Sequence, residues 1–491
     1  MTAKTTTTAY EGVIGLEIHA ELETESKMFC GCAVVDSTTA APNTYVCPIC
    51  LGFPGVLPVI NKRAVEFAIK VGLALNCEIA TVNVFARKSY FYPDLPKGYQ
   101  ISQYELPLCK NGWTEIDLPD GSTKRIGIRR AHLEEDTGKS IHVGGSSLID
   151  FNRSGVPLLE IVTEPDIRNG IEAEAFGRKL RAILQYLGVN SGDMSKGVLR
   201  MEPNISVRPV GSTEFRTRTE VKNLNSIRSV QRASDYEIER HIKVWESGGE
   251  VVQATMGWDE ARQQTVLQRT KESAHDYRYF PEPDLPILNT SREWVEAIRA
   301  HLPELPDTKR DRLMKAGLSR YDASVLVADR PVADYFERVM QAGADPKKGA
   351  NWIINELFAR MNKAALSAER VNEQKVSPEA LAGLIKLVDA GTINNNAAKK
   401  VLDAVFAEGG EPSAWVAKLG LEQTQDTSAV EAAVEKVLGA NPGETDRFCA
   451  GEEKVFKFLI GQVMREGRGK FPAELANDVL TAKLNARCGK S

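Results

Sequence analysis

Hydrophobic and polar residues alternate strictly along residues 13–22, near the start of the chain. Every second residue from Ile14 onward is apolar, whereas Glu17, His19 and Glu21 stand between the apolar ones. Because successive side chains of a β-strand point to opposite faces, the pattern predicts a strand whose second face gathers carboxylates around an imidazole. Carboxylates held this close need a cation or a proton to offset their repulsion, so we expect a magnesium–phosphate site there. A half-exposed edge strand with solvated charges would show the same pattern.

Two later segments repeat this alternation. Residues 199–207 and 217–224 each have apolar residues on one face and charged or amide residues on the other. The polar positions that we single out are Arg200, Glu202, Asn204, Glu220 and Lys222. A phosphoryl-transfer site needs this mixture, since carboxylates hold the metal and basic groups stabilise the charge on the phosphoryl oxygens. We therefore favour one shared site over the alternative, which is a ladder of salt bridges on a wet sheet face.

Two tight pairs of cysteines, Cys30 with Cys32 and Cys47 with Cys50, flank a short loop. Each pair can give two thiolates to one tetrahedral ion, and the Cys-Pro-Ile-Cys-Leu-Gly run from Cys47 is typical of a zinc knuckle. We expect a closed, structural zinc site, with free thiols or an iron–sulfur cluster as the alternatives. The other four cysteines lack such spacing, and in the reducing cytosol expected for this chain we predict that they form no disulfide bonds.

Two further segments carry candidate chemistry. Residues 87–104 contain two prolines and a glycine, which predict a loop, and Lys88 and its neighbouring tyrosines suit the phosphates and stacked bases of a single-stranded end. Residues 125–139 lead into three successive acids, with Glu135 in the middle, and then Lys139. These groups suit Mg²⁺ and a phosphate, but the glycine before Lys139 does not belong to a P-loop, because Leu133 replaces its first glycine. A loop packed by its own aromatic side chains and a solvated acidic turn are the respective alternatives.

The second half of the chain differs from the first. Beyond about residue 293, Ala, Glu, Lys and Leu recur at helical spacing and the strand patterns fade. Net charge over the 491 residues is −4, yet residues 448–491 hold eight Lys or Arg against five acids. That excess favours contact with a nucleic-acid backbone, although a solvated helix or a protein-interaction module would have the same composition. With no signal peptide and no apolar run long enough to span a bilayer, we expect a cytoplasmic protein.

Six segments of the chain, most of them discussed above, occur together in one known family. The segments are 13–22, 87–103, 132–139, 199–206, 222–226 and 276–286. In combination they resemble the B subunits of bacterial aspartyl/glutamyl-tRNA(Asn/Gln) amidotransferases over essentially the whole chain. The resemblance implies an α+β fold, in which an antiparallel β-sheet cradle with flanking helices is followed by two all-α domains. We expect a frayed tail at 1–9, a catalytic cradle domain at 10–292, a helical domain at 293–410 and a tRNA-binding tail domain at 411–491.

The resemblance also implies an activity. The family uses ATP to phosphorylate the side-chain carboxylate of Glu-tRNA(Gln) or Asp-tRNA(Asn), and ammonia then displaces the phosphate. An amidase A subunit supplies the ammonia and a small C subunit braces the pair. By resemblance, Glu17, His19, Glu135 and Glu220 are the catalytic residues around Mg²⁺, and the zinc knuckle is optional. The resemblance and the pattern of charged residues described above together predict the cofactor-binding residues, which are Lys88, Lys139, Arg200, Glu202, Asn204 and Lys222.

Elementary chemistry leads to the same requirement for ATP. A carboxylate resists attack by ammonia because its leaving group would be oxide, whereas an acyl phosphate offers a good leaving group. The chain carries no recognisable glutaminase nucleophile, so a partner must supply the ammonia. Two rival functions remain, and these are a non-catalytic tRNA-docking scaffold and a metallohydrolase built on Glu17, His19 and Glu21. The second rival lacks another well-placed histidine.

Overall fold

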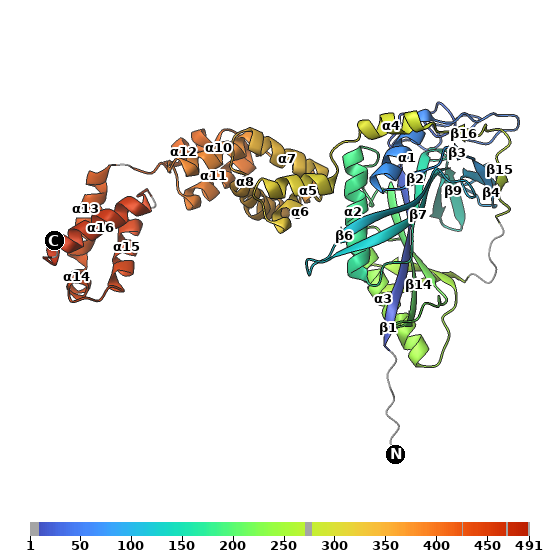
Figure 1. Ribbon diagram of the computed structural model, residues 1–491. Helices are drawn as coiled ribbons and strands as arrows, with labels where there is room; N and C mark the ends of the chain where they lie inside the picture. The colour runs from blue at the N-terminus through green and yellow to red at the C-terminus, as the bar shows by residue number, and fades with distance from the viewer. Residues whose placement is uncertain (1–8, 271–276, 425, 468–469, 490–491) are drawn as a thin grey trace, which may run out of the picture. The chain divides into compact units, whose positions relative to one another are not determined.

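The computed structural model describes residues 9–270, 277–424, 426–467 and 470–489. The chain divides into two compact units, Met1–Pro306 and Asp307–Ser491, of which the first holds the β-sheets and the second is helical (Figure 1). Most of the expected frayed tail, the start of the 276–286 motif, and the basic residues Arg468 and Lys490 lie outside the described residues.

A nine-stranded sheet forms the centre of the first unit. In spatial order its strands are β14 (Gln264–Thr270), β13 (Ala254–Asp259), β12 (Thr219–Lys222), β11 (Leu199–Pro209), β1 (Tyr10–Glu21), β10 (Pro157–Thr163), β7 (Thr123–Glu135), β6 (Cys109–Asp117) and β2 (Glu78–Ile79). Neighbouring strands are antiparallel except for β12 and β13, which are parallel. Because β1 pairs with β10 on one side and β11 on the other, the edge-strand alternative for residues 13–22 is wrong.

One face of this sheet is the core of the unit. The alternate apolar residues of β1 are fully buried, as the period of two requires, and Ile14 and Ile18 have no exposed surface. Three helices contribute to the same hydrophobic cluster: α1 (Lys62–Ala74), α2 (Gly170–Leu187) and α3 (Ile227–Glu246). Each begins at a side-chain cap, in which Asn61, Asn169 or Ser226 accepts a hydrogen bond from a backbone N–H of the first turn. The opposite face of the sheet is thereby left for polar side chains.

Short strands and one helix complete the first unit. They are β4 (Ala86–Ser89), β5 (Tyr99–Ser102) and β15 (Phe280–Pro281) in one small sheet, β3 (Val82–Asn83) with β16 (Leu288–Asn289), the hairpin of β8 (Lys139–Val143) and β9 (Ser146–Asp150), and α4 (Arg292–Ala300). The segment 87–104 is therefore not a continuous loop, because its ends pair as β4 and β5.

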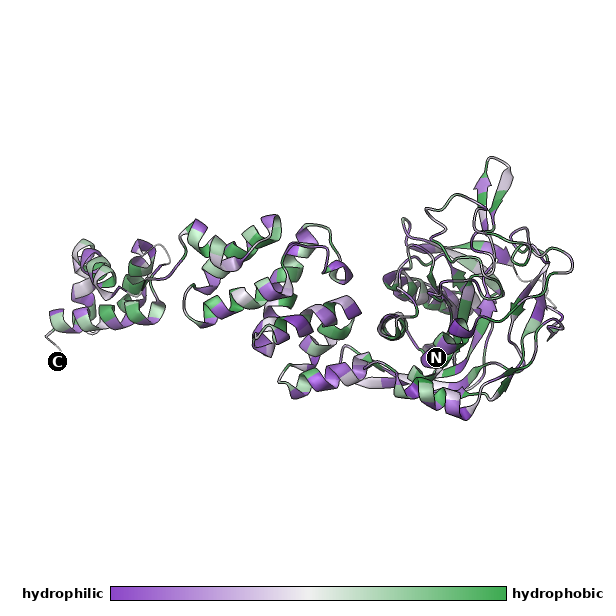
Figure 2. Cartoon of the chain, turned by 90° about the horizontal axis from the view of Figure 1, so that it is seen from above, coloured by the Kyte–Doolittle hydropathy of each residue, from purple (hydrophilic) through white to green (hydrophobic). Residues whose placement is uncertain are grey.

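The second unit is built from helices throughout its described residues. They are α5 (Pro306–Lys315), α6 (Arg320–Val327), α7 (Arg330–Gln341), α8 (Pro346–Asn351), a π-helical segment (Trp352–Leu357), α9 (Phe358–Lys363), a 3₁₀ turn (Ala368–Arg370), α10 (Pro378–Asp389), α11 (Asn395–Glu408), α12 (Pro412–Leu419), α13 (Thr427–Ala440), α14 (Pro442–Cys449), α15 (Val455–Glu466) and α16 (Ala473–Arg487). Figure 2 shows apolar and polar residues in alternating bands along these helices, as amphipathic helices require. They enclose two separate hydrophobic cores, one within residues 313–416 and one within 430–484. No described helix has the length and hydropathy needed to cross a membrane.

A disulfide bond joins Cys449 to Cys488, so the prediction that these cysteines stay unpaired is wrong. The two residues stand at the ends of α14 and α16, and these ends meet with Cα atoms 5.1 Å apart. That separation lies within the range a disulfide needs. Their 39-residue separation in sequence hid the pairing, because only tertiary packing brings the helix ends together.

Candidate active site

The polar face of the nine-stranded sheet carries a row of four charged or imidazole side chains. In register across β11, β1, β10 and β7 they are Arg200, His19, Glu160 and His132. His19 Nε2 lies 3.5 Å from Glu160 Oε2, and His132 Nε2 lies 3.8 Å from the same carboxylate oxygen. Four neighbouring strands therefore deliver this row to one place without any contribution from a flexible loop.

Further carboxylates surround His19. Glu17, which pairs in register with Glu202, approaches the imidazole with Oε1 3.8 Å from Nε2. On the other side, Glu134 Oε1 lies 3.4 Å from His132 Nε2, and the Glu134 carboxylate accepts hydrogen bonds from Gln100 and Ser102. The result is a cluster of acids around the two histidines, which we call the acidic cluster.

Two overlapping sets of side chains have metal-binding geometry. His19 belongs to both sets, once with Glu17 and Glu202 and once with Glu134 and Glu160, and within each set the ligand atoms all lie within 4.8 Å of one another. Carboxylate oxygens are the ligands that Mg²⁺ prefers, and an incomplete protein ligand set leaves positions for phosphates and water. The donor set therefore fits a magnesium ion.

The electrostatics of the face show crowded negative charge. Burial, and then the charge of Glu160, raise the pKa of Glu17 above its ordinary value. Burial acts to lower the pKa of His19, but the hydrogen bond to Glu160 and the surrounding carboxylates outweigh it and bring that pKa to about 9. A divalent cation among these acids would relieve the same repulsion.

Basic side chains border the acids. Burial opposes the charge of Lys88, but Glu134 overcomes it and raises the lysine pKa, and the ammonium lies 5.2 Å from the ring centre of Tyr277. On the other side, Lys222 Nζ lies 2.5 Å from Glu202 and 3.2 Å from Glu220. Basic groups in these places are suited to the charge that develops on a transferring phosphoryl group.

Three more of the residues singled out in the sequence have clear places around this face. Arg200 donates to Asp136 at 2.9 Å, and Asn204 pairs in register with Glu220 at the β11–β12 junction. Glu220 accepts a hydrogen bond from the Thr255 hydroxyl at 3.2 Å. Glu220 thus stands on β12, the strand next to the one that carries Glu202 and Asn204.

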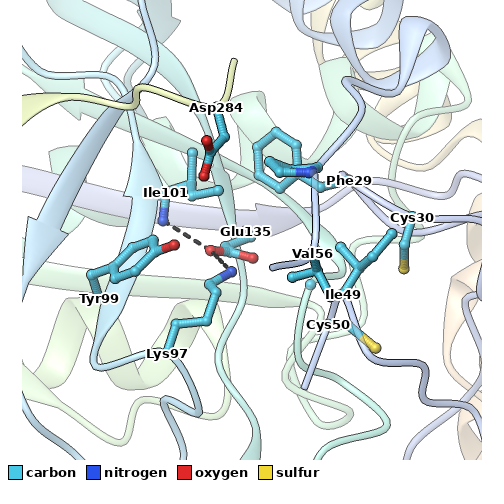
Figure 3. A pocket seen from close by; sticks show the side chains of 12 residues that line it. Phe29, Cys30, Ile49, Cys50, Val56, Lys97, Tyr99, Ile101, Glu135 and Asp284 are labelled. Carbon is cyan, nitrogen blue, oxygen red and sulfur yellow. Dashed lines mark hydrogen bonds and ion pairs between the residues drawn. The ribbon is translucent and has the colours of Figure 1, made fainter. Parts of the chain in front are cut away.

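The structure places Glu135 elsewhere. Strand alternation sends adjacent side chains to opposite faces, so Glu134 belongs to the acidic cluster and Glu135 does not. Figure 3 shows Glu135 between the Lys97 ammonium and the backbone N–H of Ile101, with Cys30 and Cys50 across the same pocket. Lys139 begins β8, outside the nine-stranded sheet, where it pairs in register with Asp150.

The four cysteines converge as their spacing predicts. The sulfur atoms of Cys30, Cys32, Cys47 and Cys50 all lie within 4.8 Å of one another. A tetrahedral zinc site with sulfur ligands at about 2.3 Å requires this closeness. Hydrogen bonding from Cys30 lowers the pKa of Cys50 to about 4, against the opposing effect of burial. The donor set fits a closed structural zinc site.

Aromatic residues of the 87–104 segment and of residues 277–279 lie next to Lys88. Tyr104 stacks on Tyr279 with ring centres 4.2 Å apart, and Tyr90 meets Tyr277 edge to face. Phe91, by contrast, is 95% exposed. Part of the segment is therefore packed by its own aromatic rings, and its tip presents free aromatic surface.

Sequence reasoning missed two side chains of the acidic cluster, His132 and Glu160, and it did not single out Glu134 from the three successive acids at 134–136. One hint of Glu160 was present in the sequence, since it is the one acid within the apolar strand β10. The structure shows that it is almost fully buried. His132 and Glu134 share the period of two along β7, and that period excludes Glu135. What the sequence does not contain is the strand order that brings β7 and β10 beside β1.

Comparisons with known proteins agree over both units. A family model described as the GatB/GatE catalytic domain matches residues 12–296, and one described as the GatB domain matches residues 334–484. Similar curated proteins come from Thermodesulfovibrio yellowstonii (51% identity over 96% of this chain and 98% of the relative), Moorella thermoacetica (52%, over 97% and 100%) and Geobacter sulfurreducens (51%, over 97% and 99%). Each of the three is named as the B subunit of an aspartyl/glutamyl-tRNA(Asn/Gln) amidotransferase.

Proposed function

This chain belongs to the GatB family, and from that premise we propose that it is the subunit of a tRNA-dependent amidotransferase in which the esterified Glu or Asp side chain is activated and amidated. The proposed reaction is ATP-dependent phosphorylation of the side-chain carboxylate on Glu-tRNA(Gln) or Asp-tRNA(Asn), followed by attack of ammonia to give Gln-tRNA(Gln) or Asn-tRNA(Asn). The observation that carries the proposal is the convergence of His19, Glu134 and Glu160 on one face of the nine-stranded sheet, with the half-buried Lys88 of β4 beside them.

The residues of this face have distinct proposed roles. Glu134, Glu160 and His19 would hold the magnesium ion, and Glu17 and Glu202 approach the same imidazole from the other side. When bound, Mg²⁺ screens the charge of the phosphates during transfer. Lys88 is suited to orient the substrate carboxylate against the γ-phosphate, because its half-buried ammonium lies beside the acids.

Lys222 and Arg200 are the proposed phosphate-side cations. Lys222 bridges Glu202 and Glu220, and Arg200 is held in place by Asp136, so both are fixed before substrate arrives. Preorganised positive charge costs no reorganisation at the moment of transfer. For Glu135, paired with Lys97, and for Lys139, on its separate hairpin, the proposal requires no direct contact with the phosphate.

Partners follow from the chemistry. An acyl phosphate hydrolyses readily, so ammonia must arrive internally and water must be kept out. We propose an amidase A subunit as the source of ammonia, a small C subunit that braces the pair, and charged tRNA as the substrate carrier, all in the cytoplasm. The complex would act as a carbon–nitrogen ligase with glutamine as amide donor.

Zinc is proposed as a structural component. Cys30, Cys32, Cys47 and Cys50 supply four ligands and leave no position for substrate, so the metal would brace residues 30–50 and take no part in catalysis.

The decisive experiment uses the complex reconstituted with amidase and C subunits. Release of inorganic phosphate from ATP and formation of the amide would be followed with Glu-tRNA(Gln) and with Asp-tRNA(Asn). Glu160→Gln should abolish both products, whereas Glu164→Gln, which alters an exposed carboxylate just after the same strand, should leave them unchanged. If Glu160→Gln amidates at the wild-type rate, this chain is a tRNA-docking scaffold and the catalytic proposal is wrong.

A further inference from the structure

Lys27 has no exposed surface, which is unusual for a lysine. Its ammonium donates to the Cys50 sulfur at 3.6 Å and to the backbone carbonyl of Phe151 at 3.3 Å. Among the described residues it forms no ion pair with a carboxylate. Because a buried ammonium needs nearby acceptors, the Cys50 sulfur and the Phe151 carbonyl hold Lys27 against the cysteine site.

The same sulfur site is fastened to residues 151–156, which we call the bracing turn. Ser154 donates its hydroxyl hydrogen to the Cys50 carbonyl oxygen at 3.0 Å, and the Gly155 carbonyl accepts from the backbone N–H of Met28 at 2.7 Å. Gly155 has φ +83°, which favours glycine, and it lies against Cys50, because a Cβ atom at this position would be in ordinary contact, at 3.4 Å, with the Cys50 Cβ atom. The turn therefore packs directly on Lys27 and the cysteine site.

The other side of the bracing turn contacts Asp136. The backbone N–H of Gly155 donates to the Asp136 carbonyl at 2.9 Å, and Arg153 Nε lies 3.7 Å from the Asp136 carboxylate. Asp136 in turn holds Arg200 at 2.9 Å, in register with His19. A continuous path of contacts thus runs from the four cysteines to the proposed phosphate site.

We propose that Lys27 is a positioning residue that neutralises thiolate charge at the four-cysteine site and ties that site to the bracing turn, so that metal occupancy controls the order of Asp136 and Arg200. The inference rests on the proposed zinc site. Four thiolates around Zn²⁺ carry a net charge of −2, and one buried ammonium in contact with a sulfur reduces it. Groups that contact metal ligands in this way tune both affinity and orientation.

The first test measures zinc retention in the full-length chain. Lys27→Met removes charge and hydrogen bonds, and Lys27→Gln keeps a donor without the charge. Lys309→Met is the matched control, because Lys309 is also buried but pairs with Glu337 in the other unit. Zinc transfer to a colorimetric chelator should be about tenfold or more faster in Lys27→Met, intermediate in Lys27→Gln and unchanged in Lys309→Met. Wild-type transfer rates in a folded Lys27→Met protein would overturn the proposal.

The second test needs no substitution and covers the case in which Lys27→Met does not fold. Hydrogen exchange of the wild-type chain is compared with zinc bound and after chelation. Amides of Ser154, Gly155 and Val156 should lose protection when zinc is removed, whereas those of α10 should not change. Unchanged protection in the bracing turn would refute the coupling. Neither readout depends on ATP or tRNA, so the inference can fail while the proposed amidation stands, and the reverse also holds.

Discussion

At the scale of single residues, two adjacent glutamates have opposite surroundings. Glu134 faces His132 and Lys88, and Glu135 pairs with Lys97 next to the cysteine site. Each is nearly fully buried, so burial alone does not distinguish them. Their difference arises from strand alternation, and it yields a sharp prediction.

Glu134→Gln should reduce ATP-dependent phosphate release by a factor of about 10³ or more, because it removes a charge from the proposed magnesium site. Glu135→Gln should retain most of that activity and act mainly on stability, since its carboxylate serves Lys97 and the Ile101 N–H. Phosphate release and melting temperature would be measured for both variants in the reconstituted complex. Equal losses of activity at the two positions would contradict the assignment of Glu134, and not Glu135, to the proposed magnesium site.

The same pair shows how far sequence reasoning reaches. The alternation along β1 predicts which residues are buried and which gather at the site, and Glu17 and His19 are indeed neighbours. An acidic run such as residues 134–136 does not reveal which of its members faces the site unless the strand is known to continue through it. Glu160 was hidden for another reason, because an isolated acid in an apolar strand acquires a role only when its neighbouring strands are known.

At the scale of elements, α3 is attached to the edge of the sheet by a buried carboxylate. Glu237 accepts hydrogen bonds from Thr219 on β12 and Thr265 on β14, each at 2.6 Å, and from Arg240. Thr219 directly precedes Glu220 on β12, so this attachment also helps to hold Glu220 in place. Removing one member of a buried charged network leaves the others unsatisfied, at a cost of about 3–5 kcal/mol.

Glu237→Gln should therefore lower the free energy of unfolding of the first unit and change its pH dependence. Burial acts to raise the pKa of Glu237, but hydrogen bonds from Arg240, His241 and the two threonines outweigh it and hold that pKa well below its usual range. The stability from this group is present above the ordinary glutamate pKa of about 4.3 and is lost as pH falls below it. Thermal unfolding from pH 7 to pH 3 should show a steeper acid loss in wild type than in Glu237→Gln. The control, Glu239→Gln, alters an exposed carboxylate on the same helix and should follow wild type.

The disulfide between α14 and α16 gives a second prediction at this scale. Closing a loop of 39 residues restricts the unfolded chain and is worth about 4 kcal/mol in the chain-entropy model. Reductant should lower the unfolding midpoint of the 430–484 core in the wild-type chain, while a Cys449→Ser variant should show the lower midpoint with or without reductant. If the unfolding midpoint of the wild-type chain is the same with and without reductant, the bond adds no stability in solution.

At the scale of the whole molecule, the helical half raises the question of what its charges bind. Some basic side chains of the last helices are already neutralised, since Lys483 and Arg487 pair with Glu435. Lys454 and Lys457 are exposed at the start of α15. Fewer basic residues can therefore contact a phosphate backbone than the excess in the sequence indicates, because some of them already pair with acids.

Charge reversal of Lys454 and Lys457 to Glu should weaken binding of charged tRNA and make the negative slope of log affinity against log salt concentration shallower by about 2, because two phosphate contacts are lost. The control variant reverses Lys347 and Lys363, which are exposed on the preceding helices, and so makes the same change in net charge. Binding would be measured over a range of salt concentrations with the assembled complex. If the last helices form a protein-interaction module, both variants will bind tRNA with the wild-type slope, and the defect of Lys454→Glu/Lys457→Glu will appear instead in assembly with the partner subunits.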